Sequence, residues 1–305
     1  MVQLVQRVRS FVGAYPELIS VLAAAVIGLA VHSPLRWLDS HQGIDVLLAV
    51  LVFATALTIE PASLRRLGRT WRVLLAAVGT GIVVLPVLSW AASRLVSAGS
   101  LRDGVMVAGL APCEIASVAT TAMAGGEAGL SAGVLVGSTV ATLAVAGPIL
   151  TFEAGHADVH PAGIIVNLAL VVALPLAAGI AVRGLTPLGD RADRVANVTA
   201  IAAVAALVAL IAAEVHLSAP YLRVAIALVV FLASSAVVGR LLGVRSHQRA
   251  SRALLLTTSM RDFAIAADLA VAAFGPAAAA PLGLYGILVL VWGTAAAGTF
   301  RRHKS

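Results

Sequence analysis

One apolar stretch of this sequence carries charged side chains that a membrane helix would ordinarily exclude. The stretch LLLTTSMRDFAIAADLAVAAF, residues 254–274, is long enough to lie in a bilayer, yet it contains Arg261, Asp262 and Asp268. An arginine at mid-membrane costs at least ~2.5–3.5 kcal/mol even on lenient insertion scales. We therefore expect these charges to pair, to hold a substrate or to carry a proton. A buried ion pair that only holds two helices together is the alternative.

A second polar cluster interrupts an earlier apolar run. Residues 103–126 read DGVMVAGLAPCEIASVATTAMAGG, in which Pro112 removes a backbone donor and Glu114 follows two residues later. Ser117, Thr120 and Thr121 then have the spacing of one helical face. Interrupted helices in corresponding positions are the best sequence indication of a transporter's binding site.

Hydroxyl side chains continue in the next apolar run. Ser131, Ser138 and Thr142 have offsets of seven and eleven residues, which places them on one helical stripe that could face the interrupted run. Membrane serines and threonines also bond to their own backbone, so that interpretation stays open for each hydroxyl. The candidate substrate- or ion-binding residues are Cys113, Glu114, Ser117, Thr120, Thr121, Ser131, Thr257, Thr258, Ser259, Arg261, Asp262 and Asp268.

The composition indicates the class of protein that positions these residues. Of 305 residues, 60% are hydrophobic and 11% are charged, and the mean hydropathy is +1.01. A soluble domain has roughly 25% charged residues, so we expect an all-α integral membrane protein. The Lys and Arg residues that give the net charge of +7 lie between apolar runs. This position favours a role as signals for membrane orientation over nucleic-acid binding. The single cysteine, Cys113, excludes an internal disulfide and a cysteine metal cluster.

Ten apolar runs approach the ~20 residues that a helix needs to cross a bilayer. With the N-terminus inside, the large majority of the 21 Lys and Arg residues fall on the cytoplasmic side. We expect an inner (plasma) membrane protein with both termini cytoplasmic and one domain over residues 1–305. The predicted spans lie near residues 16–33, 43–60, 72–94, 103–125, 127–150, 162–183, 194–214, 221–241, 250–275 and 280–299.

Ten spans divide into two sets of five, at about residues 16–150 and 162–299. An odd-numbered repeat must insert upside down the second time, and inverted repeats are a common plan of secondary transporters. The two polar, interrupted runs are the fourth and ninth spans, which are equivalent members of the two sets. The sequence therefore predicts two inverted five-helix repeats, each with one broken helix.

A resemblance to a known family rests on three stretches: ATALTIEPASLRRL (54–67), LAPCEIASVATTAMAGGEAGLSAGVLVGSTVATLAVAGPIL (110–150) and SMRDFAIAADLAVAAFGPAAAAPLGLYG (259–286). They are similar to the bile acid:sodium symporter superfamily, which includes bacterial homologues and arsenite efflux permeases. The resemblance covers nearly the whole chain. It implies ten helices in two inverted repeats, with broken helices four and nine crossing at the centre and a panel domain that rocks against this core. It also implies secondary transport of an organic anion or similar small solute by alternating access.

The sodium-binding residues that the resemblance implies are only partly present in the first half. Ser117 matches the serine that follows the break in helix four, but Val118 replaces the asparagine beside it. Ser131 matches a serine of helix five, whereas Leu135 replaces the threonine one turn later. Two oxygen ligands of the family are therefore missing here.

The ninth span departs further from the family pattern. Met260 matches, but Thr257 replaces a glutamate, Arg261 a glutamine and Asp262 an asparagine. Arg261 thus puts a fixed positive charge where the symporters bind a mobile one. We expect transport that does not strictly require Na⁺, with H⁺ coupling or uncoupled transport instead, and no other cofactor. Arg261 needs a partner, and the available acids are Glu114, Asp262 and Asp268.

Cys113 offers an alternative function. The sequence APC, 111–113, is similar to the arsenite permeases, and a thiolate is a soft ligand suited to As(III). The following residues depart from that subfamily, and a lone cysteine is usually a small packing residue. Arsenite or metalloid efflux is therefore the alternative, and a non-transporting sensor is another. An intramembrane enzyme would need a nucleophile–base pair or metal ligands at depth, and we expect none. The solute and the oligomeric state stay open.

Overall fold

The computed structural model describes residues 43–59, 70–154, 161–186, 188–212 and 219–302, with short pieces at 20, 23–24, 26–28, 61–62 and 68. Over these residues the chain is helical, with one isolated antiparallel bridge between Cys113 and Arg261. The predicted first span, 16–33, lies mostly outside the described residues, as do residues 1–19 and 303–305, and the predicted side of the termini stays a prediction.

The other nine predicted spans each fall on described helix. The fourth and ninth spans are each divided into two helices, as predicted. The elements are α4 (Gly43–Ala56), α6 (Trp71–Ser93), α7 (Ser100–Val107), α8 (Ser117–Met123), α9 (Ala128–Ala154), α10 (Pro161–Leu168), the π-helix η2 (Ala169–Ala173), α11 (Leu174–Leu185), α12 (Asp190–Ala212), α13 (Ala219–Leu242), α14 (Gln248–Ser259), α15 (Phe263–Phe274), the 3₁₀ helix η3 (Pro276–Ala278) and α16 (Ala280–Arg302).

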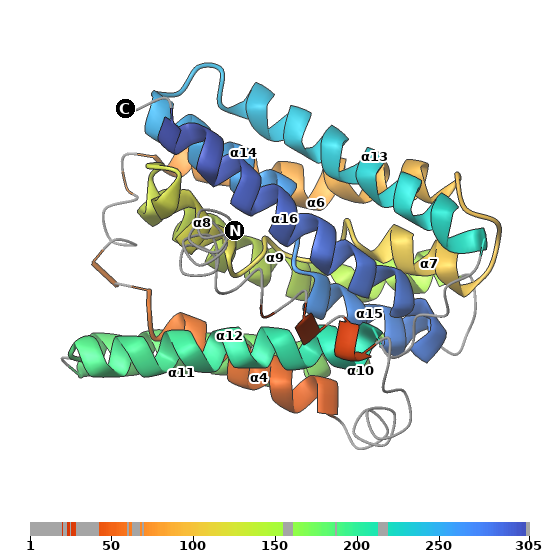
Figure 1. Cartoon of the computed structure of the whole chain (residues 1–305), viewed down its shortest axis with the longest axis horizontal. Helices are drawn as coiled ribbons and strands as arrows, with labels where there is room; N and C mark the ends of the chain where they lie inside the picture. Colours follow the sequence, from red (N-terminus) through yellow and green to blue (C-terminus); the bar gives the residue numbers. More distant parts are fainter. Residues whose placement is uncertain are drawn as a thin grey trace, which may run out of the picture.

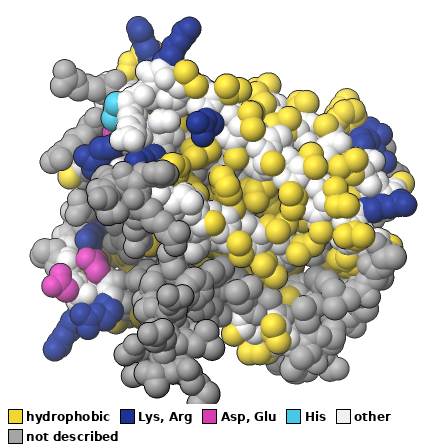
Figure 2. Space-filling model, turned by 45° about the horizontal axis from the view of Figure 1, so that its top comes forward, with side chains coloured by type: hydrophobic (Ala, Val, Ile, Leu, Met, Phe, Trp, Pro, Cys, Tyr) yellow, Lys and Arg dark blue, Asp and Glu magenta, His cyan; other side chains and the backbone are white. Residues whose placement is uncertain are grey.

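The outer surface of these helices suits a lipid environment. Among the described residues, six helical stretches are long and apolar enough to cross a membrane, and α4 and α15 are shorter apolar helices. Large apolar side chains such as Val83, Val140 and Leu241 are exposed. Figure 2 shows one face on which hydrophobic side chains cover the middle, while Lys and Arg lie mostly toward the ends. The prediction of a multi-pass membrane protein is confirmed.

The helices form two layers (Figure 1). We call α4, α10, η2, α11 and α12 the panel layer, in which α4 packs against both α11 and α12. The remaining helices form the core layer, built around the divided pairs α7–α8 and α14–α15. The layers meet where α12 packs on α16, α10 on α9, and α4 and α10 on α15.

The two divided pairs have matching neighbours in the core layer. Helix α6 packs on α7 as α13 packs on α14, and α9 packs on α8 as α16 packs on α15. The two divided helices therefore occupy equivalent surroundings, which agrees with the predicted equivalence of the fourth and ninth spans.

A π-helical turn interrupts the panel layer between α10 and α11. Pro175 has no N–H group to donate to the carbonyl four residues earlier, and its ring would clash there in a regular helix. The wider turn at Ala169–Ala173 relieves that clash. The turn directly follows the segment that carries Asn167, which contacts the core layer.

Candidate functional site

The two divided helices cross through a pair of extended segments. The backbone N–H of Glu114 donates to the carbonyl of Met260 at 2.8 Å, and that of Asp262 donates to the carbonyl of Pro112 at 2.9 Å. Each break frees backbone groups that cannot stay unpaired away from water, and here each break pairs with the other. The predicted breaks and their crossing are confirmed.

Asp262 is the N-cap of α15. Its Oδ1 accepts hydrogen bonds from the backbone N–H groups of Ala264 at 3.0 Å and Ile265 at 2.9 Å. A carboxylate at this position satisfies free donors and complements the positive end of the helix. The ninth span therefore breaks without a proline, because a capping aspartate starts a new helix inside it.

Arg261 lies inside the core layer and is 3% exposed, so the prediction that it does not face lipid is confirmed. Its Nη2 donates to the carbonyl of Ala111 in the crossing segment. The guanidinium also faces α6, where a Cβ built on Gly81 would lie 3.3 Å from Nη1. The prediction of an acidic partner was wrong within the described residues, where Arg261 forms no ion pair. A carbonyl freed by the break at Pro112 takes that place.

The predicted hydroxyl stripe of α9 does face the crossing. Ser138 Oγ accepts from the backbone N–H of Cys113 at 3.1 Å, and Thr142 Oγ1 donates to the carbonyl of Leu110 at 3.1 Å. The stripe therefore satisfies backbone groups that the divided fourth span leaves free.

Two other hydroxyls join α8 to α9. Thr121 Oγ1 donates to Ser131 Oγ at 3.3 Å, whereas Thr120 Oγ1 donates to the carbonyl of Ala116, within its own segment, at 2.8 Å. Residues 129–133 spell G-x-S-x-G, but Ser131 lies inside a helix and not on a strand-to-helix turn. Ser131 therefore lacks the turn that exposes the nucleophilic serine in enzymes with this motif.

Cys113 is buried within the crossing. Its Sγ lies 3.0 Å from Ser117 Oγ, and it is not among the residues that line the nearby cavity described below. The thiol therefore has a hydrogen-bonding neighbour but no access to that cavity in this conformation.

The polar residues before the second break serve their own helix. Thr257 Oγ1 and Ser259 Oγ donate to carbonyls four residues earlier, at 2.8 and 2.7 Å. Ser259 also accepts from Trp292 Nε1 of α16 at 2.9 Å. Thr258 Oγ1 has no hydrogen-bond partner among the described residues. The structure brings these three residues beside the crossing, not to the cavity.

Asp268 joins the two layers and does not contact Arg261. Asn167 Nδ2 of α10 donates to both carboxyl oxygens of Asp268, at 3.2 Å each. Asp45 of α4 also lies close to Asp268. Of the three acids that the sequence offered as partners of Arg261, Asp268 instead contacts the panel layer.

We expect Asn167→Ala to destabilise the protein by roughly 1.5–3 kcal/mol, the usual range for hydrogen bonds to a charged group. The loss arises because Asp268 would lose its donor from the panel layer. Thermal unfolding in detergent measures it. Asn197→Ala is the matched control, since Asn197 lines a cavity; equal losses in both variants would contradict this role of Asn167.

A cavity of about 290 Å³ lies between the layers, directly beside the crossing. Of the twelve candidate residues, Glu114 alone lines it. Glu114 is 1% exposed, and Oε2 of its carboxyl group has no hydrogen-bond partner among the described residues. Polar side chains from the panel layer complete the wall. The lining residues are Thr55, Thr58, Glu114, Ile115, Ala116, Val118, Ala119, Ala122, Ala128, Asn197, Ala200, Ile201, Val204 and Leu290.

Sequence reasoning missed the panel side of this cavity. Thr55 and Thr58 have the i, i+3 spacing of one helical face and lie in the first stretch that carries the family resemblance. Asn197 is an isolated amide in an apolar span. Isolated polar residues in membrane spans were the available signal for all three.

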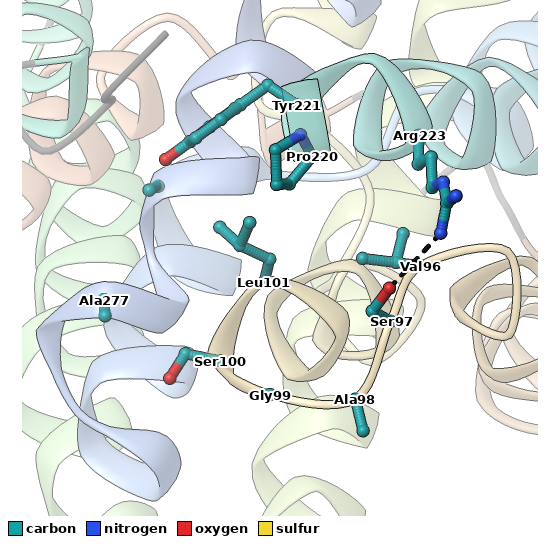
Figure 3. A pocket seen from close by; sticks show the side chains of 11 residues that line it. Val96, Ser97, Ala98, Gly99, Ser100, Leu101, Pro220, Tyr221, Arg223 and Ala277 are labelled. Atoms are coloured by element: carbon teal, nitrogen blue, oxygen red, sulfur yellow. Dashed lines mark hydrogen bonds between the residues drawn. The ribbon is translucent and has the colours of Figure 1, made fainter. Parts of the chain in front are cut away.

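A second cavity, of about 680 Å³, lies where the α6–α7 connection meets the start of α13 (Figure 3). Arg223 Nη1 donates to Ser97 Oγ at 3.3 Å at its edge, and Leu101, Pro220 and Tyr221 line it. None of the twelve candidate residues lines this cavity, so the smaller cavity beside the crossing is the candidate site.

Comparison with known proteins gives two matches. The model of the "Sodium Bile acid symporter family" matches residues 45–236. A Bacillus subtilis (strain 168) protein named "Uncharacterized sodium-dependent transporter YocS" is 26% identical over 165 residues, which are 53% of this chain and 51% of that protein. The chain spans about half the length of this curated relative.

Proposed function

Because this chain belongs to the sodium bile acid symporter family, we propose that it is a secondary transporter that moves a small organic solute by alternating access. The observation that carries the proposal is the cavity between the two layers, whose wall includes Glu114 from the crossing. Movement of the panel layer against the core layer would open the cavity first to one side of the membrane and then to the other. The proposed fold is the ten-helix inverted repeat, and its matched core packing supports it.

The charge pattern supports a cytoplasmic opening in this conformation. Asn197 lies one helical turn after Arg194 on α12, and Arg183 of α11 pairs with Asp193 of the same α12. Under the positive-inside rule this end of the panel layer faces the cytoplasm. We propose that the protein lies in the plasma membrane and that, in the described state, its solute enters the cavity from the cytoplasmic side.

A cavity-filling variant tests the transport proposal. Ala119 is exposed to the cavity from α8, so Ala119→Trp is expected to fold and to abolish solute flux by occupying the site. Candidate solutes are first identified by a thermal-shift screen of purified protein against organic anions, organic cations and arsenite. Their flux into proteoliposomes is then measured. Val140→Trp, on an exposed position of α9, is the control and should transport normally. Normal flux through Ala119→Trp would contradict the proposed route.

We also predict that Na⁺ does not specifically stabilise this protein. Val118, Leu135, Thr257 and Arg261 stand where the family has sodium-binding residues, and the guanidinium of Arg261 already contributes a positive charge. A bound ion at 100 times its Kd would stabilise the folded state by about 2.7 kcal/mol. The measurement compares melting in NaCl and KCl at equal ionic strength and pH. A saturable shift with Na⁺ but not K⁺ would contradict the prediction and agree with the name of the Bacillus relative.

A further inference from the structure

The panel side of the cavity beside the crossing is one face of α12. The lining residues of this helix are offset by three, four and seven positions from the first of them, which is the spacing of a single helical face. They are Asn197, Ala200, Ile201 and Val204. Because Asn197 begins this face, its side chain is directed toward the same space as the apolar residues that follow it.

The core side of the cavity is formed by small side chains of α8. Ala116, Ala119 and Ala122 follow one another at intervals of three residues, and all three line the cavity. Val118 and Leu290 add branched aliphatic surface. This side of the cavity is therefore suited to an aliphatic body.

The polar surface that a solute can reach lies on the panel side. Glu114 lines the cavity from the crossing, but it is only 1% exposed. Asn197 and Thr58 are exposed residues of the lining, and Thr55 is half-buried. Thr55 lies in the last turn of α4, which packs on α12, and Thr58 follows shortly after it. The amide and the two hydroxyls therefore belong to the same wall.

These polar groups offer a defined pattern of donors and acceptors. Thr58 Oγ1 donates its proton to the carbonyl of Thr55 at 2.7 Å, so its lone pairs are what it offers to a solute. The side chain of Asn197 carries a carbonyl acceptor beside an NH₂ donor.

A carboxamide complements this pattern. It has an N–H donor and a C=O acceptor side by side, which match the two halves of the Asn197 amide, and a second N–H for the oxygen of Thr58. A carboxylate has acceptors only and an ammonium group has donors only. Each of these charged groups would leave one half of the Asn197 amide unmatched.

The volume of the cavity limits the body that such a head group can carry. At about 290 Å³ it lies at the lower end of the ~300–1,000 Å³ that ligand pockets span. A single aliphatic ring suits this volume, whereas the fused ring system of a bile acid requires a larger pocket.

We propose that this cavity binds a small uncharged solute, a carboxamide on a compact aliphatic body, whose amide head group pairs with the side chain of Asn197. The inference rests on the proposed function and narrows its solute class. Asn197 determines the preference for the head group, Thr58 supplies a second acceptor, and the alanines of α8 hold the body.

Three probes with the same ring and different head groups test the inference: cyclohexanecarboxamide, cyclohexanecarboxylate and cyclohexylmethylammonium. Each is titrated into the purified full chain and followed by thermal shift and calorimetry. The carboxamide is expected to bind saturably, at least about tenfold more tightly than the other two. The amide of a bile acid, which has the same head group on a steroid body, should bind at least about tenfold more weakly than cyclohexanecarboxamide.

Variants of α12 and α8 locate the binding. Asn197→Leu keeps a side chain of similar size and removes the amide, so it should weaken cyclohexanecarboxamide binding at least about tenfold. Val198→Leu is the matched control, because Val198 is the next residue of α12, is 60% exposed and is not among the lining residues. This control should bind the carboxamide as the native chain does. Ala119→Trp should abolish binding, and Val140→Trp should not.

Several results would overturn the inference. These are carboxylate or ammonium binding as tight as that of the carboxamide, equally tight binding of the bile-acid amide, unchanged affinity in Asn197→Leu, or no carboxamide binding up to about 10 mM. If Asn197→Leu does not fold, Asn197→Ala replaces it with the same expected loss. Carboxylate binding that Ala119→Trp abolishes would overturn the carboxamide head group alone and leave the transport cavity standing. Solute flux unaffected by Ala119→Trp would instead overturn the proposed function.

Discussion

Replacing Arg261 by glutamine is expected to leave an inserted, folded protein that loses transport or acquires a dependence on Na⁺. The guanidinium donates to the carbonyl of Ala111 and occupies the space against Gly81 on α6. Glutamine removes the fixed charge and leaves the carbonyl oxygen of Ala111 available to a mobile cation. The measurements are proteoliposome flux and the NaCl-minus-KCl shift in melting temperature, both compared with the native chain.

Arg261→Met should impair transport at least as much as Arg261→Gln does. Methionine offers no donor to the carbonyl of Ala111 and leaves Asp262 without its positive neighbour. We expect a loss of roughly 1.5–3 kcal/mol, the range for a hydrogen bond to a charged group. Arg252→Gln is the matched control. Arg252 is the buried arginine of α14, donates to the carbonyl of Ala124 at 2.8 Å and lies over the ring of Phe300.

The control should lose stability but keep the native ion dependence, since Arg252 lies away from the crossing. If Arg261→Gln and Arg261→Met both transport at the native rate with native stability, Arg261 has neither a functional nor a structural role. If Arg252→Gln acquires the same Na⁺ dependence as Arg261→Gln, the Na⁺ dependence is not a specific effect of removing the arginine at the crossing.

Cross-linking the panel layer to the core layer is expected to abolish transport. Asn167 and Asp268 contact each other across the two layers. The variant Asn167→Cys/Asp268→Cys, in a Cys113→Ala background, can be joined by a short, reducible bifunctional thiol reagent. Because alternating access requires the layers to move, the joined protein should lose solute flux, and reduction should restore it.

Each single-cysteine variant treated with the same reagent is the control for modification without a link. Undiminished flux in the joined Asn167–Asp268 variant would contradict relative movement of the layers at this contact.

The divided helices could be predicted from sequence because their causes are local. Pro112 removes a donor, and a capping residue such as Asp262 inside an apolar run marks a new helix start. The stripe of Ser138 and Thr142 followed from helical periodicity alone. These features depend on spacing, which a single sequence displays directly.

The partners of the charged residues could not be predicted, because they depend on three-dimensional contacts between distant segments. Arg261 donates to a carbonyl that is free to accept only because the fourth span is broken. Asp268 contacts Asn167, a residue 101 positions away. The cavity was missed for the same reason: its panel side comes from isolated polar residues on α4 and α12, and they become a set only when the layers pack.

Accessibility of Ala119 from the two sides of the membrane tests alternating access most directly. The cysteine of Ala119→Cys, in a Cys113→Ala background, would report on the cavity through labelling with a membrane-impermeant maleimide in proteoliposomes of known orientation. We predict labelling from both sides in the free protein, and from one side when the Asn167–Asp268 link is also present. Labelling from a single side in the free protein, unchanged by the link or by a bound solute, would contradict alternating access through this cavity.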